Sequence, residues 1–117
     1  MPDAARKILM DPSAEIYYSF ANVWEVAIKH RKSPDKICYS SEVFESLCHQ
    51  SGFIPLKTTN KHARMTETLE YDSSSAPEEH NDPFDRLLIA QAKTEGMILI
   101  SHDHLLPYYH EACVLTV

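Results

Sequence analysis

Three carboxylates are the side chains in this sequence best placed to do chemistry: Glu25, Asp85 and Asp103. Asp103 directly follows an apolar run, whereas Glu25 and Asp85 lie in segments whose apolar residues recur at helical spacing. Asp85 shares a helix face with Leu88 and Ala92, and a carboxylate directed toward an apolar surface needs a partner or a cation. We therefore interpret the three acids as candidate functional residues.

Each acid also has a structural alternative. Glu25 precedes Lys29 by four residues, and such an exposed helix ion pair contributes only about 0.2–0.5 kcal/mol. Asp85 in a first helical turn complements the helix dipole by about 0.3–1 kcal/mol. Asp103 equally suits a cap for the short segment that follows it. Asp82, which precedes a proline, is interpreted as a helix N-cap near the site and not as a catalytic residue.

The elements that must position these acids alternate between strands and helices. Short β-prone or apolar runs predict strands near residues 16–18, 53–56, 97–101 and 114–117. Helical spacing, caps and terminators predict helices over 4–10, 20–32, 42–49, 60–69 and 83–95. This alternation favours an α/β layer fold with a mainly parallel sheet, in which functional groups gather beyond the carboxyl ends of the strands.

The composition of the chain excludes some classes of function. The chain has 117 residues, which suits a single domain over residues 1–117. Its only glycines, Gly52 and Gly96, exclude glycine-rich dinucleotide and phosphate loops. The net charge of −6 argues against broad electrostatic binding of nucleic acid. The segment from Glu67 to Asp85 is acidic and contains no Lys or Arg, so much of the imbalance lies near the predicted site and calls for cations.

The sequence also predicts a cellular location. No apolar run exceeds four residues, far short of the roughly 20 needed to span a bilayer, and the first residues lack the order of a secretion signal. The three cysteines make an odd count without C-x-x-C spacing, which suits reduced thiols. We therefore expect a cytoplasmic protein without membrane contact.

Three segments carry a family resemblance: WEVAIK at 24–29, HNDPFDRLLIAQA at 80–92 and LISHD at 99–103. Together they resemble the PIN domain, specifically the PilT N-terminal-like branch that includes VapC-type toxins. The resemblance extends from about residue 4 to the last residue, and the segment 82–92 is its most specific part. It implies a three-layer fold with a mainly parallel sheet of about four strands flanked by helices.

The resemblance also implies an activity. Members of this family are typically Mg²⁺- or Mn²⁺-dependent ribonucleases, often held inactive by a partner antitoxin, and such domains commonly form homodimers. Their acidic cluster corresponds to Glu25, Asp85 and Asp103, which are then both the metal ligands and the catalytic residues. Oxygen ligands hold the ion, which lowers the pKa of a bound water and neutralises charge on the phosphoryl oxygens. The resemblance thus predicts endonucleolytic cleavage of RNA by a toxin component.

The N-terminal part of the chain differs from the family pattern. A family member usually begins with a strand that ends in an aspartate, followed by a helix, before the segment that matches residue 4 onward. We therefore expect the first family strand and its metal-ligating aspartate to be missing, because Asp3 and Asp11 follow no strand. This leaves a second hypothesis open: a catalytically impaired PIN-like module that binds proteins, for example by capturing an antitoxin.

Basic residues give weaker candidates for RNA contact. Lys29, Arg31 and Lys32 cluster at the end of one predicted helix, where they can instead complement the helix C-terminus. Arg86, beside Asp85, is a candidate substrate contact, although a structural ion pair is the favoured interpretation.

Histidines raise a third idea, a transition-metal site. His102 and His104 flank Asp103, but zinc sites need about four convergent ligands, usually at paired spacing. We interpret both as surface residues.

Overall fold

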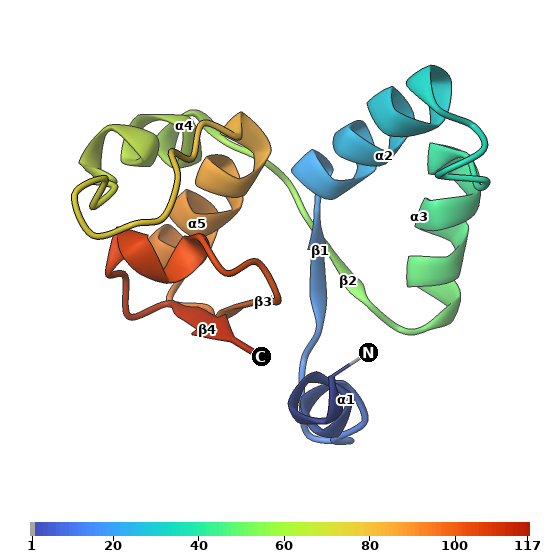
Figure 1. Cartoon of the computed structure of the whole chain (residues 1–117). Helices are drawn as coiled ribbons and strands as arrows, with labels where there is room; N and C mark the ends of the chain where they lie inside the picture. Colours follow the sequence, from blue (N-terminus) through green and yellow to red (C-terminus); the bar gives the residue numbers. More distant parts are fainter. Residues whose placement is uncertain (1) are drawn as a thin grey trace. The chain divides into compact units, whose positions relative to one another are not determined.

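The order of strands and helices follows the predicted alternation (Figure 1). The computed structural model describes residues 2–117. The elements are α1 (Asp3–Leu9), β1 (Tyr17–Ser19), α2 (Phe20–Lys32), α3 (Ser41–Gln50), β2 (Ile54–Leu56), α4 (Asn60–Met65), the 3₁₀ turn η1 (Thr66–Thr68), α5 (Pro83–Glu95), β3 (Leu99–Ser101), the 3₁₀ turn η2 (Leu106–Tyr109) and β4 (Val114–Thr116).

The described chain divides into two units. One unit is Asp11–Thr58, and the other combines the residues up to Met10 with Thr59–Val117. We call them the Glu25 unit and the Asp85 unit, after the candidate acids they carry. The prediction of one domain over residues 1–117 stays a prediction.

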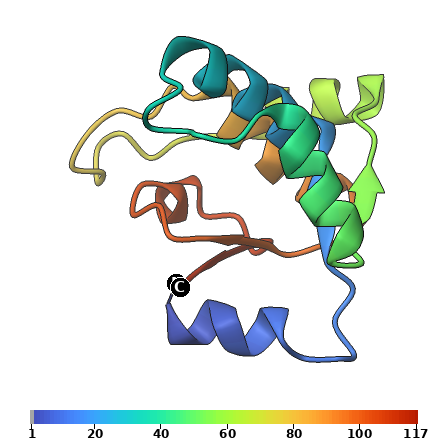
Figure 2. The same ribbon diagram turned by 90° about the vertical axis from the view of Figure 1, so that its right-hand side faces the viewer.

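In the Glu25 unit, β1 pairs in parallel with β2, with Tyr17 opposite Ile54 and Ser19 opposite Leu56. The two strands are connected through α2 and α3, which pack side by side (Figure 2). Ser19 ends the strand and starts α2, because its hydroxyl accepts a hydrogen bond from the Ala21 amide at 3.0 Å. This junction places Glu25 in the second turn of α2.

In the Asp85 unit, β3 pairs in parallel with β4, with Leu99 opposite Val114 and Ser101 opposite Thr116. The connection between them includes η2, whose Leu106 and Tyr109 are buried. The core of this unit is formed by buried side chains from α5, η2 and the segment after η1; they are Leu69, Ile89, Ala90, Leu106 and Tyr109. The middle of α5 and the start of β3, where Leu99 packs against this cluster, are thereby tied to one core.

The boundaries of α5 confirm the predicted helix. The Asp82 side chain accepts hydrogen bonds from the first-turn amides, Pro83 occupies the first turn, where its missing N–H costs nothing, and Gly96 ends the helix with a φ of 67°. A residue with a side chain is strained in that left-handed conformation, so glycine is the natural terminator.

Two predicted boundaries differ from the structure by more than one residue. The strand predicted from residue 97 begins at Leu99, because the Met97 amide turns back to the Ala92 carbonyl at 2.9 Å and completes the helix end. The helix predicted to residue 69 is an α-helix only to Met65 and then tightens into η1. Such tightening is common at the ends of helices.

The α/β class is confirmed by this order of helices and short parallel strands. Within residues 2–117 the strands pair two by two, β1 with β2 and β3 with β4. The single sheet of about four strands in a three-layer fold therefore stays a prediction. Across the same residues, no helix is both long and apolar enough to cross a bilayer.

Candidate functional site

The start of α5 fixes the position of Asp85. The Asp82 carboxylate accepts hydrogen bonds from the amides of Phe84 at 2.9 Å and Asp85 at 3.3 Å. Asp85 therefore lies in the first turn, where the free amides and the helix dipole favour a negative charge. Its side chain is 24% exposed, so the carboxylate is accessible yet held against the protein.

A buried histidine contacts this carboxylate. The His80 side chain is only 5% exposed, and its Nε2 lies 3.1 Å from Asp85 Oδ2. Its other ring nitrogen, Nδ1, lies 2.7 Å from the hydroxyl of the buried Tyr109. Both nitrogens of the imidazole thus have protein partners, as a buried polar group requires.

Arg86 extends this group of hydrogen bonds. Its Nη1 donates to the Tyr109 hydroxyl oxygen at 3.3 Å, and a guanidinium can only donate. The same hydroxyl lies 2.7 Å from His80 Nδ1, and the other nitrogen of that ring lies 3.1 Å from Asp85 Oδ2. The result is a hydrogen-bond chain from Arg86 through Tyr109 and His80 to Asp85.

Burial keeps the tyrosines of this region protonated. The pKa of Tyr109 is raised above its ordinary value because the hydroxyl is removed from water, which outweighs the opposing effect of Arg86. The pKa of Tyr71, whose ring centroid lies 5.0 Å from that of Tyr109, is raised chiefly by the same cause. The Tyr109 hydroxyl therefore retains its proton at neutral pH and can donate to His80.

Asp103 is held at the carboxyl end of β3. Its amide donates to Ser101 Oγ at 3.0 Å, and its Oδ1 accepts a hydrogen bond from the Leu105 amide at 2.8 Å. The capping alternative proposed from the sequence is therefore present. The carboxylate remains 37% exposed, so it keeps acceptor capacity for another ligand.

His80, Asp85 and Asp103 converge. Each offers one ligand atom, and these atoms lie within 4.8 Å of one another. Ligands on opposite sides of one small divalent ion lie about 4 Å apart, because each bond is about 2.1 Å. Two carboxylate oxygens and an imidazole nitrogen at this spacing therefore suit a divalent cation after small side-chain rotations. We call these three residues the His80 cluster.

The structure thus brings together two of the acids singled out in the sequence, Asp85 and Asp103, and adds His80. The histidine lies two residues before the helix cap Asp82 and is the first residue of the segment 80–92 that carries the family resemblance, and these were the sequence signals available for it. Nothing local in the sequence indicates that its ring is buried against Tyr109.

Glu25 belongs to the other unit. Its Oε2 lies 3.2 Å from Lys29 Nζ on the next turn of α2, so the ion pair considered as its structural alternative is present. Its role as a metal ligand stays a prediction.

The basic candidates fall into two kinds. Lys29, Arg31 and Lys32 are exposed in the last turn of α2. Arg86 has partners within the protein: besides its bond to Tyr109, its Nη2 donates to the Thr66 carbonyl at 3.1 Å, and its guanidinium carbon lies 5.6 Å from the Tyr109 ring centre. These contacts are with a hydroxyl, a carbonyl and a ring, and not the ion pair expected from the sequence; its role as a contact to RNA stays a prediction.

The two histidines flanking Asp103 lie outside the cluster. His104 is 71% exposed, with Nε2 3.7 Å from Glu78 Oε1. The His102 ring contacts the Val117 carbonyl. Their interpretation as surface residues agrees with this exposure.

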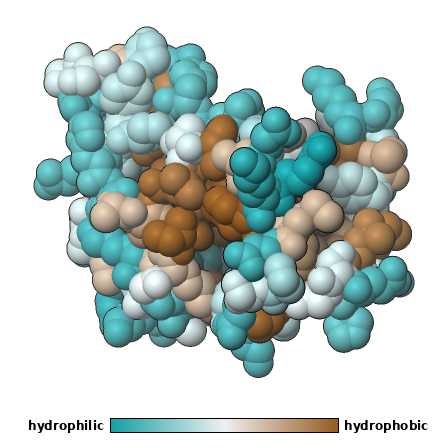
Figure 3. Space-filling model, turned by 90° about the horizontal axis from the view of Figure 1, so that it is seen from below, coloured by the Kyte–Doolittle hydropathy of each residue, from teal (hydrophilic) through white to brown (hydrophobic). Residues whose placement is uncertain are grey.

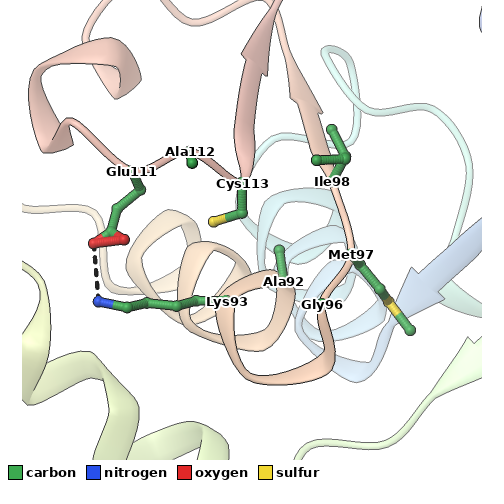
Figure 4. A pocket seen from close by; sticks show the side chains of 8 residues that line it. All are labelled: Ala92, Lys93, Gly96, Met97, Ile98, Glu111, Ala112 and Cys113. Atoms are coloured by element: carbon green, nitrogen blue, oxygen red, sulfur yellow. Dashed lines mark hydrogen bonds and ion pairs between the residues drawn. The ribbon is translucent and has the colours of Figure 1, made fainter.

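A separate open pocket of about 330 Å³ lies at the opposite end of α5 (Figure 4). An ion pair between Lys93 Nζ and Glu111 Oε2, 3.0 Å apart, lies on one side of it. Its lining is mostly apolar and consists of Ala92, Lys93, Gly96, Met97, Ile98, Glu111, Ala112 and Cys113. The pocket shares no residue with the His80 cluster, so it is not part of the candidate site.

Comparison with known proteins gives one match. A family model described as the PIN domain matches residues 1–109. No curated protein and no solved structure matches the chain.

Proposed function

The chain belongs to the PIN domain family, whose members are generally nucleases, and from this premise we propose that it is a metal-dependent endoribonuclease. The observation that supports this most is the convergence of Asp85 and Asp103 with His80 within 4.8 Å. One carboxylate comes from the start of a helix and the other from the carboxyl end of a strand. Functional groups of parallel α/β folds gather in such places.

The residues have distinct roles in this proposal. Asp85 and Asp103 supply oxygen ligands to Mg²⁺ or Mn²⁺, and Glu25 supplies a third carboxylate. When bound, the ion lowers the pKa of a water and neutralises charge on the phosphate. The Asp82 cap holds the first turn that carries Asp85, and His80 Nε2 contacts the Asp85 carboxylate in the structure.

The protein has a net negative charge, so binding of the RNA phosphates requires a local group of basic side chains. Lys29, Arg31 and Lys32 form a small exposed basic group, and we propose them as the contact to the RNA backbone. A contact made by few basic residues predicts a shallow dependence of binding on salt.

We further propose that the protein is the toxin of a toxin–antitoxin pair and acts in the cytoplasm, where its three free cysteines stay reduced. Exposed apolar side chains support a protein partner: Phe20 and Trp24 on α2 are 55% and 51% exposed, with ring centroids 6.1 Å apart. Figure 3 shows hydrophobic residues, in brown, reaching the surface among hydrophilic ones. The same feature favours the second candidate, a binding module without cleavage, and also suits a homodimer.

The test is cleavage of single-stranded RNA by the purified protein with Mg²⁺ or Mn²⁺. We expect Asp85→Asn to lower the cleavage rate at least about 10- to 100-fold. Substitution of a residue that only hydrogen-bonds to a metal ligand already lowers metal affinity or activity by that factor, and Asp85 is proposed as a ligand itself. Asp35→Asn, an exposed acid in the Glu25 unit, is the matched control and should cleave like the wild type. Equal cleavage by wild type and Asp85→Asn would remove the site assignment, and cleavage by neither would favour the binding module.

A further inference from the structure

We propose that His80 is itself a ligand of the ion, through Nε2, and that this nitrogen makes the site select a divalent transition metal such as Mn²⁺ over Mg²⁺. The inference rests on the proposed metal-dependent function and adds the identity of the ion.

The first step is the placement of the ring. His80 Nε2 lies 3.1 Å from Asp85 Oδ2, and both belong to the cluster whose third ligand atom comes from Asp103. These two atoms are hydrogen-bonded to each other in the structure. Both could serve as ligands of one cation, and the imidazole, with 5% of its side chain exposed, is already held in place.

The second step is the proton on the ring. To bind an ion through Nε2, His80 must carry its proton on Nδ1. Nδ1 then donates to the Tyr109 oxygen 2.7 Å away, which can accept as well as donate. Metal-binding histidines commonly donate their second N–H to a fixed partner in this way.

The third step is selectivity. Mg²⁺ prefers oxygen ligands and retains several waters, whereas imidazole favours the first-row transition metals. Without His80, Asp85 and Asp103 would form an all-oxygen site with little bias between Mg²⁺ and Mn²⁺. With the nitrogen included, the donor set favours Mn²⁺. Mn²⁺ binds such sites more weakly than the other divalent transition metals of the first row. A preference for Mn²⁺ over Mg²⁺ is therefore the most stringent test of the selectivity proposed for the nitrogen ligand.

Pulsed electron paramagnetic resonance of Mn²⁺ bound to the intact protein tests the ligand directly. We expect a ¹⁴N coupling from an imidazole, which changes to a ¹⁵N coupling when the protein contains ¹⁵N-labelled histidine. This measurement needs no substitution, so it does not depend on whether a variant folds. Bound Mn²⁺ without a histidine nitrogen coupling would overturn the inference.

Variants assign the coupling to one residue. His80→Asn keeps a polar atom for Tyr109 and removes Nε2, so we expect the coupling to disappear and Mn²⁺ affinity to fall at least about tenfold, with a smaller loss for Mg²⁺. His80→Gln is a second variant, for use if the first does not fold. The control is His110→Asn: His110 lies outside the cluster, is paired with Asp72 at 3.0 Å, and has a positive φ that Asn tolerates. A coupling that survives in His80→Asn would overturn the assignment.

These measurements are independent of RNA cleavage. Cleavage without a nitrogen coupling would retain the proposed nuclease and overturn the present inference. A nitrogen coupling that depends on His80, in a protein that does not cleave RNA, would support the inference and argue against the nuclease.

Discussion

At the scale of the single residue, Tyr109 belongs both to the core and to the candidate site. Its ring packs among the buried residues of the Asp85 unit, while its hydroxyl lies between Arg86 and His80. The sequence offers two adjacent tyrosines, Tyr108 and Tyr109, without distinguishing them. Burial distinguishes them: Tyr109 is 3% exposed and its hydroxyl faces the His80 ring.

A single substitution tests this dual role. Tyr109→Phe keeps the ring in the core but leaves His80 Nδ1 without its partner. A buried polar group left unsatisfied costs about 1–3 kcal/mol, so we expect the free energy of unfolding in urea to fall by that amount. Mn²⁺ affinity, measured by calorimetry, should also fall, because the second N–H of the ligand is no longer fixed.

The matched control is Tyr108→Phe, which changes the neighbouring ring in the same way. Tyr108 is half-buried, and its ring meets Tyr71 edge-on. Its loss should alter stability much less and leave Mn²⁺ binding unchanged. Equal effects of the two substitutions would show that the Tyr109 hydroxyl has no special role.

Helix α5 is the element that aligns most of the site. Its first turn carries Asp85 and Arg86, its middle is buried against the core, and its last turn ends at Gly96, from which the chain enters β3. Asp103 follows that strand directly. A helix packed antiparallel to the strand that follows it brings its start near the end of the strand, which is why residues 18 positions apart share one site.

The cap of α5 gives a prediction at this scale. Asp82→Ala removes the acceptor for the Phe84 and Asp85 amides, and loss of such a cap costs about 0.5–2 kcal/mol. We expect this loss in urea unfolding, together with weaker Mn²⁺ binding, because the first turn that holds Asp85 frays. Asp82→Ser retains a capping oxygen and should restore most of the stability. A fully stable Asp82→Ala protein would contradict the role assigned to the cap.

At the scale of the whole molecule, the candidate acids are divided between two units. Asp85 and Asp103 lie in one unit, and Glu25 lies on α2 of the other, paired with Lys29. The family resemblance predicts that Glu25 joins the same metal site.

Two substitutions separate the roles open to Glu25. If it is a metal ligand, Glu25→Gln lowers Mn²⁺ affinity at least about tenfold in calorimetry. Lys29→Gln removes the same ion pair and leaves the carboxylate, so Mn²⁺ affinity should change by less than about twofold. Glu25 is excluded from the site if the two variants bind Mn²⁺ equally well.

Local sequence signals were sufficient for most elements. Asp82, Pro83 and Gly96 act on the backbone within a few residues, so they predicted α5 from the sequence. The start of β3 was wrong by two residues, because the hydrogen bond from Met97 back to Ala92 depends on how the helix ends in three dimensions. Pairing of the strands two by two could not be read from the sequence, since each strand is only three residues long and gives no register signal.

The sequence by itself determined the α/β class and the start and end of α5, and it singled out Asp85 and Asp103 as candidates, because capping, helix periodicity and carboxylate chemistry depend on residue type and short spacing. Only the tertiary structure decided that His80 joins them. Its partner Tyr109 is 29 positions away, and burial of an imidazole between a phenol and a carboxylate arises from packing of distant segments. No local pattern encodes such a contact, since the free energy that holds it comes from the core formed around α5 and η2.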